Sequence, residues 1–221
     1  MRTMGQVLDF RRRQLTKDDL VRMRLPKRYW NASCDQVPNV RDKKSSVGAR
    51  DMLEAYIRNM EEMRQDGVGL LLWGENGCGK SSIAAIVAKE YRRRFNTVLF
   101  IEAANIRTMV IDKDHFDEDE TYWQRAMSVD VLVIDDIGKG TTDRTGFGER
   151  LMDELIRTRN ANKLVTIITT NAVPRGEKET LSDILKPSTI HSLKEHVSVI
   201  NVRGEDQRDK ISGDISNRLA K

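Results

Sequence analysis

Gly74 to Ser82 read GENGCGKSS and lie between two apolar runs, GVGLLLW and IAAIVA. This stretch matches the spacing G-x-x-x-x-G-K-[ST], in which glycines let successive backbone N–H groups point inward at phosphate oxygens. A helix after the loop adds its positive N-terminal end to phosphate binding. We therefore expect Lys80 to bind the β- and γ-phosphates of a nucleotide and Ser81 to coordinate Mg²⁺. The other residues of the loop are also expected to bind the nucleotide, Cys78 mainly through its backbone: Gly74, Glu75, Asn76, Gly77, Cys78, Gly79 and Ser82.

A second polar site is predicted where the apolar run VLVI ends in Asp135 and Asp136. A carboxylate at the carboxyl end of a buried strand can meet the metal ion on the phosphate-binding loop. We assign Asp135 to Mg²⁺, through water, and Asp136 to polarising the attacking water. Asn171 follows the run TIITT, where its neutral amide can hydrogen-bond the γ-phosphate or the water. The predicted catalytic residues are Lys80, Asp136 and Asn171.

Apolar and amphipathic stretches alternate along the chain. Continuous Val, Ile and Leu runs separated by helical stretches indicate a parallel sheet covered on both faces. The predicted fold is a three-layer α/β domain of the P-loop NTPase class, with an extra strand between the phosphate-binding strand and the acid strand. The expected strands are 69–73, 97–102, 130–135, 164–170 and 197–202. The expected helices are 49–65, 80–94, 103–111, 121–127, 147–161 and 180–195.

Composition limits the class of protein. The chain has 221 residues, of which 38% are hydrophobic and 33% charged. No apolar run approaches the roughly 20 residues that span a bilayer, and the N-terminus has no apolar signal core. The two cysteines, Cys34 and Cys78, do not indicate a disulfide framework or an all-cysteine zinc site. We expect a cytoplasmic protein.

Positive charge is concentrated at the start of the chain. Residues 1–50 contain 13 Lys/Arg and 5 Asp/Glu, which favours an anionic partner. Thr16, followed three residues later by Asp19, marks a helix start. We predict three regions: a basic helical and linker segment at 1–46 that docks a partner, an ATPase domain at 47–208, and a polar tail at 209–221. The docking element is expected to be the basic segment 11–28.

Residues 26–208 resemble the AAA+ ATPases of the bacterial and phage helicase-loader family (DnaC/DnaI-like), which are close to the IstB-type transposition helper ATPases. The resemblance rests on the segments LPKRYWNAS, LLLWGENGCGKSSIAAIVAKE, VLFIEAANI, VLVIDDIGK, ELIRTRNANKLVTIITTN and RGEDQR.

The resemblance implies a five-stranded parallel sheet of order 5-1-4-3-2 without a full lid domain. It also implies ATP and Mg²⁺ as cofactors, self-association through the ATP interfaces, single-stranded DNA, and a replicative hexameric helicase as partner. By position, Tyr29 and Asn31 would lie near the adenine. Arg159 matches a basic position that is common in the family.

The sequence departs from the family in two places. Loaders of this type carry an arginine just before the last strand that reaches the neighbouring subunit's γ-phosphate, but residues 190–196 read IHSLKEH. Lys194 would be a poor substitute because it lacks the planar guanidinium fork. The remaining candidates to act in trans are Arg144, Arg150 and Arg157. The missing arginine implies weak hydrolysis.

The second departure lies between the second and third strands, a region that in loaders helps contact single-stranded DNA. Here it includes DKDHFDEDE at 112–120, whose six acids and one lysine repel phosphate. DNA contacts would then come from Arg107, Tyr122, Trp123 and Arg125, or from basic patches elsewhere. Packing of that helix onto the sheet explains Tyr122 and Trp123 equally well.

Three functions remain open. The chain loads or remodels a replicative helicase on single-stranded DNA, or it assembles on duplex DNA as a transposition helper, or it is a non-hydrolysing nucleotide-gated adaptor. The first is the prediction that the resemblance favours. DNA preference separates the first two functions, and nucleotide turnover separates both from the third.

Overall fold

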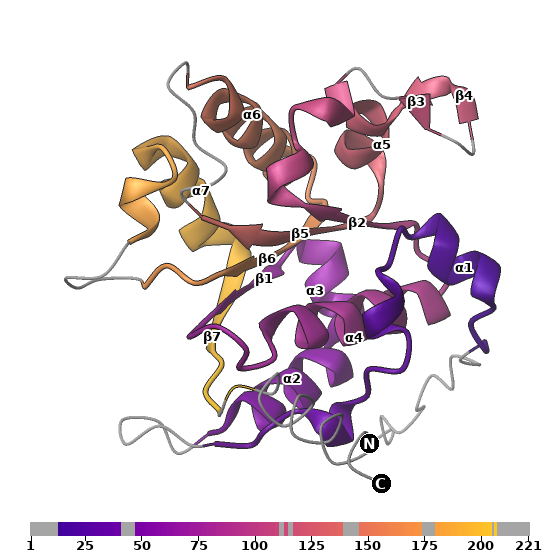
Figure 1. The fold of residues 1–221 in the computed structure, drawn as a ribbon, viewed down its shortest axis with the longest axis vertical. Helices are drawn as coiled ribbons and strands as arrows, with labels where there is room; N and C mark the ends of the chain where they lie inside the picture. The colour runs from indigo at the N-terminus through magenta and orange to yellow at the C-terminus, as the bar shows by residue number, and fades with distance from the viewer. Residues whose placement is uncertain are drawn as a thin grey trace, which may run out of the picture.

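The computed structural model describes residues 13–40, 47–110, 113–114, 117–138, 146–173, 180–204 and 206. At its centre lies a parallel sheet of five strands in the order β2-β5-β6-β1-β7 (Figure 1). Read from the other edge, this is the predicted order 5-1-4-3-2. The strands are β1 (Gly69–Trp73), β2 (Val98–Glu102), β5 (Val131–Ile137), β6 (Val165–Thr170) and β7 (Val197–Asn201).

Helices cover both faces of the sheet, as predicted. On one face lie α2 (Ala49–Arg58), α3 (Met60–Asp66) and α4 (Lys80–Arg93). On the other lie α5 (Tyr122–Ser128), α6 (Phe147–Ala161) and α7 (Pro187–His196) (Figure 1). The helices of the described part of the chain include none with the length and apolar character needed to cross a membrane.

The apolar strands are continuous because both of their faces are buried. Leu70 and Leu72 belong to the core beneath α4, while Leu71, between them, belongs to the core beneath α6. Each core therefore takes alternate residues of the same strand. Because all neighbouring strands run parallel, their carboxyl ends lie together at one end of the sheet.

The described part of the N-terminal segment packs against the α4 face. Its helix α1 (Lys17–Arg22) begins at Thr16 with the predicted capping box, in which the Thr16 hydroxyl accepts a hydrogen bond from the Asp19 N–H. Met23 and Leu25 then enter the core beneath α4, and the Phe100 N–H of edge strand β2 donates to the Met23 carbonyl at 2.8 Å. The boundary at residue 46 stays a prediction.

Three predicted helices differ from the structure. The stretch 49–65 is interrupted at Asn59, whose φ of −98° and ψ of 15° end α2 and start α3. The stretch 103–111 contains only 3-10 turns, η3 (Ala103–Asn105) and η4 (Thr108–Val110). The stretch 180–195 is a 3-10 turn, η6 (Leu181–Asp183), followed by α7, which starts at Pro187 because proline lacks an N–H and suits a helix's first turn.

The remaining described elements are short. An antiparallel hairpin, which the sequence did not predict, precedes α5. It consists of β3 (Lys113–Asp114) and β4 (Asp117–Thr121). The N-terminal segment also contains η1 (Lys27–Tyr29) and η2 (Cys34–Gln36).

Candidate nucleotide-binding site

The glycine-rich loop connects β1 to α4, as the motif requires. Gly79 immediately precedes α4 with a φ of +101°, a conformation that side-chain-bearing residues rarely adopt. At Gly74 the limit is space, because a Cβ would lie 2.1 Å from the Val202 carbonyl oxygen. Nothing lies within 4 Å of the Cβ position at Gly79, so space is open in front of the α4 N-terminus.

Lys80 is the first residue of α4, and it is only 7% exposed. Its Nζ donates hydrogen bonds to the Gly74 carbonyl at 3.0 Å and the Glu75 carbonyl at 2.7 Å. The Cys78 sulfur lies 3.8 Å from the same nitrogen. The ammonium group is thus buried within the loop itself, where a phosphate would meet it.

The pairing of β5 with β6 contains an irregularity at the predicted acid residues. Ile134 pairs with Ile168 and Ile137 with Thr170, so Asp135 and Asp136 together face Thr169 alone. Adjacent side chains of a regular strand point to opposite faces, and an extra residue in one strand changes their directions. The irregularity therefore accounts for both carboxylates lining one cavity.

Thr169 holds this arrangement. Its hydroxyl donates to Asp135 Oδ1 at 2.6 Å and accepts from the Asp136 N–H at 2.8 Å. Asp135 is 2% exposed, whereas Asp136 is exposed and has a φ of +60°. Asn171, just beyond β6, donates from Nδ2 to Asp136 Oδ1 at 2.9 Å.

One cavity of about 710 Å³ brings most of the predicted site residues together. It contains loop residues, both carboxylates and the Asn171 amide, as well as residues from the N-terminal segment. The lining residues are Arg28, Tyr29, Asn76, Gly77, Gly79, Lys80, Ser81, Ser82, Glu102, Ala104, Asp135, Asp136, Thr169 and Asn171.

The other predicted residues lie elsewhere. Gly74, Glu75 and Cys78 line an adjoining cavity of about 710 Å³, which shares Asn76 and Asn171 with the first. Asn31 lines neither of these two cavities. It lines a separate one beside Lys89, whose Nζ donates to the carbonyls of residues 29, 30 and 32.

Three polar residues that line the main cavity, and Ala104 beside them, were not predicted from the sequence. Thr169 was overlooked because threonine is ordinary in a buried strand. Glu102 ends β2 directly opposite Asp135, so the rule that singled out Asp135 could have found it. Arg28 lies 3.9 Å from Glu102, with its guanidinium 4.7 Å from the centre of the Tyr29 ring. No local motif marked it.

Arg159 is part of the core and not of the site. It is 0% exposed, and burial lowers its pKa to about 9. Its guanidinium donates to the Thr166 hydroxyl and to the carbonyls of Ala126, Val129 and Val165. These bonds tie α5 to β6.

Other residues that the sequence singled out either pack within the fold or lie outside the nucleotide cavity. Tyr122 is buried, and the Arg24 guanidinium lies 3.9 Å from its ring centre, which is the packing explanation for this aromatic residue. Arg157 lies 3.8 Å from Asp153, and Lys194 is exposed on α7. Arg144 falls outside the described residues.

The donors and acceptors of the main cavity fit a nucleotide with Mg²⁺. The loop offers N–H groups and Lys80 to phosphate, and Ser81 and Asp135 provide oxygen ligands of the kind Mg²⁺ prefers. Among the described residues, no group of three His, Cys, Asp or Glu side chains is placed to hold a metal ion. A Mg²⁺ ion here would therefore share its coordination with phosphate oxygens and water.

Comparisons with known proteins agree with this chemistry. Residues 70–186 match the model of the ATPase family associated with various cellular activities (AAA). The replicative helicase loader DnaC of Escherichia coli (strain K12) is 27% identical over 129 residues, or 57% of this chain and 51% of the loader. The chain thus spans about half the length of the curated relatives it matches.

Two solved structures share the fold. The crystal structure of the DnaC helicase loader has a TM-score of 0.64 at 23% identity, covering 80% of this chain and 100% of that one. The crystal structure of DnaI has a TM-score of 0.61 at 17% identity, covering 83% and 94%. Because the family model spans more than half of the sequence, the chain belongs to the ATPase family associated with various cellular activities, as a DnaC/DnaI-like AAA+ ATPase.

Proposed function

We propose that this chain is a helicase loader. It binds ATP and Mg²⁺, self-associates through its ATP interfaces, and loads or remodels a replicative hexameric helicase on single-stranded DNA in the cytoplasm. The observation that carries the proposal is the convergence of Lys80, Ser81, Asp135, Asp136 and Asn171 on one cavity. Family membership and the similarity to loaders support the rest.

Each residue has a distinct role in this proposal. Lys80 exchanges its bonds to the loop carbonyls for bonds to the β- and γ-phosphates, a substitution of one oxygen acceptor for another. Ser81 and Asp135 hold Mg²⁺, which neutralises the phosphate charge when it is bound. Thr169 orients Asp135 by its 2.6 Å hydrogen bond.

Asp136 is the general base of the proposed hydrolysis. Its carboxylate is exposed to the cavity, so it can accept a proton from water, and the Asn171 amide fixes its direction. Asn171 also lines the cavity, so it can contact the γ-phosphate when Asp136 turns toward the water. Nucleotide state is thereby coupled to the position of one hydrogen-bonded pair.

A non-hydrolysing nucleotide-gated adaptor is the second candidate. The observation that favours it is α7, a helix of ten residues without arginine, on which Lys194 is the only lysine. An ATP site that lacks a trans-acting guanidinium would bind and release nucleotide while turning it over slowly.

Steady-state ATP turnover separates the two candidates. We expect measurable turnover by the wild type and a fall of about 100-fold or more for Asp136→Asn, since general-base catalysis contributes that much. Binding of a fluorescent ATP analogue should be nearly unchanged in this variant. The matched control is Asp66→Asn, the same chemical change at the exposed end of α3. ATP binding without turnover by the wild type would contradict the hydrolytic proposal and favour the adaptor.

The same preparation distinguishes the transposition-helper alternative. A loader should prefer a single-stranded oligonucleotide over a duplex of the same length, and a transposition helper should show the reverse preference. Preference for the duplex would contradict the loader proposal.

A further inference from the structure

Phe95 occupies an unfavourable position at the end of α4. Its side chain is 71% exposed, and its φ is +67°, in the left-handed region that favours glycine. The Phe95 N–H donates to Arg92 O, and the Asn96 N–H donates to Tyr91 O, so this residue stands where helices commonly end in glycine. A bulky aromatic residue here costs stability in its backbone and gains little from burial.

A cavity lined by arginines includes Arg92 and Thr97, between which Phe95 lies in the sequence. It measures about 410 Å³, and its lining residues include Arg22, Arg92 and Arg125. Met23, Val98 and Val129 are its buried apolar lining, and Thr97 and Ser128 place exposed hydroxyl-bearing residues at it. Among the described residues that line it there is no carboxylate.

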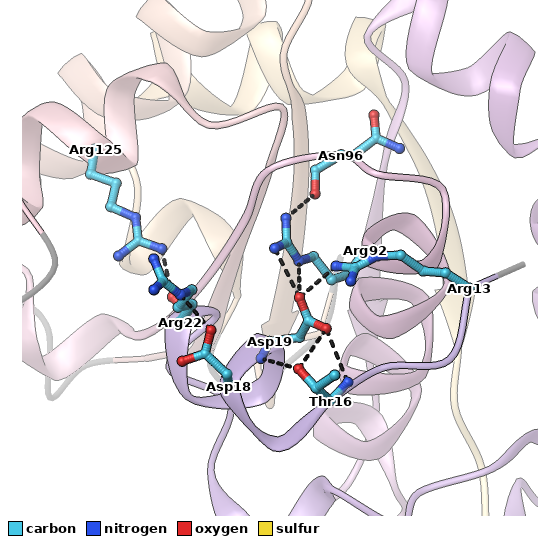
Figure 2. A network of polar contacts seen from close by, with 8 residues as sticks. All are labelled: Arg13, Thr16, Asp18, Asp19, Arg22, Arg92, Asn96 and Arg125. Carbon is cyan, nitrogen blue, oxygen red and sulfur yellow. Dashed lines mark hydrogen bonds and ion pairs between the residues drawn. The ribbon is translucent and has the colours of Figure 1, made fainter.

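Two aspartates outside the cavity lining and one backbone carbonyl hold the arginines in place (Figure 2). Asp19 accepts hydrogen bonds from Arg92 Nε at 3.0 Å and from Arg13 at 2.5 Å. Asp18 accepts from Arg22 Nε at 2.7 Å, and the Arg125 guanidinium donates to the Arg22 carbonyl at 2.5 Å (Figure 2). Arg92 also donates to the Asn96 carbonyl at 3.3 Å (Figure 2), so these bonds together fix the positions of the arginines.

Arg13 connects the aromatic ring to this network. Its guanidinium carbon lies 5.4 Å from the centre of the Phe95 ring. Its buried Nε has no hydrogen-bond partner within the described part of the protein. Arg11 and Arg12 directly precede it in the sequence. Asp130, a nearby carboxylate, is already bonded to the Thr97 amide and hydroxyl, both at 2.7 Å.

We propose that Phe95, Arg13 and the cavity lined by Arg22, Arg92 and Arg125 form a binding site for single-stranded nucleic acid. An unpaired base stacks on the exposed Phe95 ring, and the neighbouring phosphate enters the arginine-lined cavity. Aromatic platforms beside cationic grooves bind single strands in this way, because every base has a π-face and every nucleotide a phosphate. A duplex would not offer the base face that Phe95 needs.

This site is separate from the nucleotide cavity. Thr97 and Val98 lie where β2 begins, whereas Glu102, in the nucleotide cavity, lies where β2 ends. The two cavities therefore lie at opposite ends of the parallel strands, the arginine-lined cavity at the amino end of β2 and the nucleotide cavity at its carboxyl end. The inference deepens the proposed loader function, on which its DNA partner rests, by naming the surface that would contact the strand.

Fluorescence anisotropy with a labelled oligo-dT tests the site. Phe95→Gly should bind about tenfold more weakly than the wild type, since that loss falls within the range that stacking of one base on one aromatic residue contributes. Its thermal stability should be equal or higher, because glycine suits the left-handed conformation. Weaker oligo-dT binding by a Phe95→Gly variant of unchanged stability would show that Phe95 acts in binding and not in holding the fold.

The chain provides a matched control. Phe147 is also an exposed phenylalanine with an arginine beside it, Arg150 at 6.0 Å from the ring centre, but it lies on α6. Phe147→Ala should bind oligo-dT like the wild type. Arg22→Gln should lower the dependence of binding on salt concentration, since one phosphate contact fewer releases fewer counterions.

The outcomes are distinguishable. If the wild type binds no single strand in any nucleotide state, the loader proposal itself fails together with this site. If the wild type binds and Phe95→Gly binds equally well, only this site is overturned. If Phe95→Gly retains oligo-dT binding but loses the helicase in a pull-down, the surface belongs to a protein partner and the nucleic-acid inference is wrong.

Discussion

The Thr169 hydroxyl donates a 2.6 Å hydrogen bond to Asp135 Oδ1, and through this bond β6 fixes a buried carboxylate of β5. The same oxygen accepts the Asp136 N–H, so one hydroxyl supports both acidic residues at the irregularity in β5. Because Asp136 has a left-handed φ, its backbone needs a partner that holds it there. Thr169 is therefore a positioning residue for the proposed metal ligand and base.

Thr169→Val tests this role, since valine keeps the shape and removes the hydroxyl. Loss of the two hydrogen bonds should lower the free energy of unfolding by about 1–3 kcal/mol. ATP turnover should fall by about tenfold or more, because a misplaced base acts less well. Nucleotide affinity should change less than turnover, since Lys80 and the loop are untouched. Thr108→Val, at an exposed 3-10 turn, is the control. Normal turnover by Thr169→Val would show that the hydroxyl does not position the acids.

Arg28 lines the same cavity as Lys80 and Asp136, so its contribution to nucleotide binding can be tested. We expect Arg28→Ala to reduce the preference for ATP over ADP by about tenfold, as loss of one charged hydrogen bond to the γ-phosphate would. Isothermal titration with the two nucleotides measures this ratio. The control is Arg58→Ala, since the Arg58–Glu54 pair has the same 3.9 Å separation and similar exposure but lies on α2.

A mixing experiment shows whether Arg28 acts within its own subunit. Arg28→Ala subunits keep an intact Lys80, and Lys80→Ala subunits keep an intact Arg28. If Arg28 serves its own cavity, adding Lys80→Ala subunits leaves the ATP turnover of Arg28→Ala subunits unchanged. Recovery of activity in the mixture would mean that Arg28 acts on a neighbouring subunit.

Asp19 should make stability depend on pH. Burial alone would raise its pKa, but hydrogen bonds from Arg13, Thr16 and Arg92 outweigh burial and hold the pKa well below its usual range. A carboxyl whose folded pKa is depressed stabilises the fold above its unfolded pKa, near 4, and loses this contribution as pH falls toward the folded pKa. We expect Asp19→Asn to lower the free energy of unfolding by about 3 kcal/mol at pH 7.

Urea unfolding of the wild type and Asp19→Asn between pH 7 and pH 3 measures the effect. The difference between the two should shrink as pH falls below about 4. Asp18→Asn is the control, because the Asp18–Arg22 pair is exposed and exposed pairs contribute little. A difference that stays constant with pH would contradict the assigned pKa direction.

The sheet was predictable because its signals are local. Gly74 to Ser82 mark the loop, and the apolar runs around them mark strands that are buried on both faces. The relation of Lys80 to Asp135 and Asn171 also followed, since parallel strands place their carboxyl ends at one edge.

The parts that escaped prediction depend on contacts between distant segments. Thr169 acquires its role only when β5 gains an extra residue, and no local pattern signals such an irregularity. Arg28 reaches the cavity because the N-terminal segment packs against β2, where the Phe100 N–H donates to the Met23 carbonyl. No sequence motif marks this tertiary contact. Asn31, which was expected near the adenine by position, lines a different cavity together with Lys89. The helix predicted at 103–111 is absent from the described residues there, which form two isolated 3-10 turns after β2.

The central claim is that ATP binding at Lys80 controls assembly on single-stranded DNA. The most direct measurement is anisotropy of labelled single-stranded and duplex oligonucleotides with ATP, ADP or no nucleotide, for the wild type and Lys80→Ala. We expect ATP to strengthen single-strand binding by the wild type and Lys80→Ala to lose this response. Equal binding in all three nucleotide states, or a preference for the duplex, would contradict it.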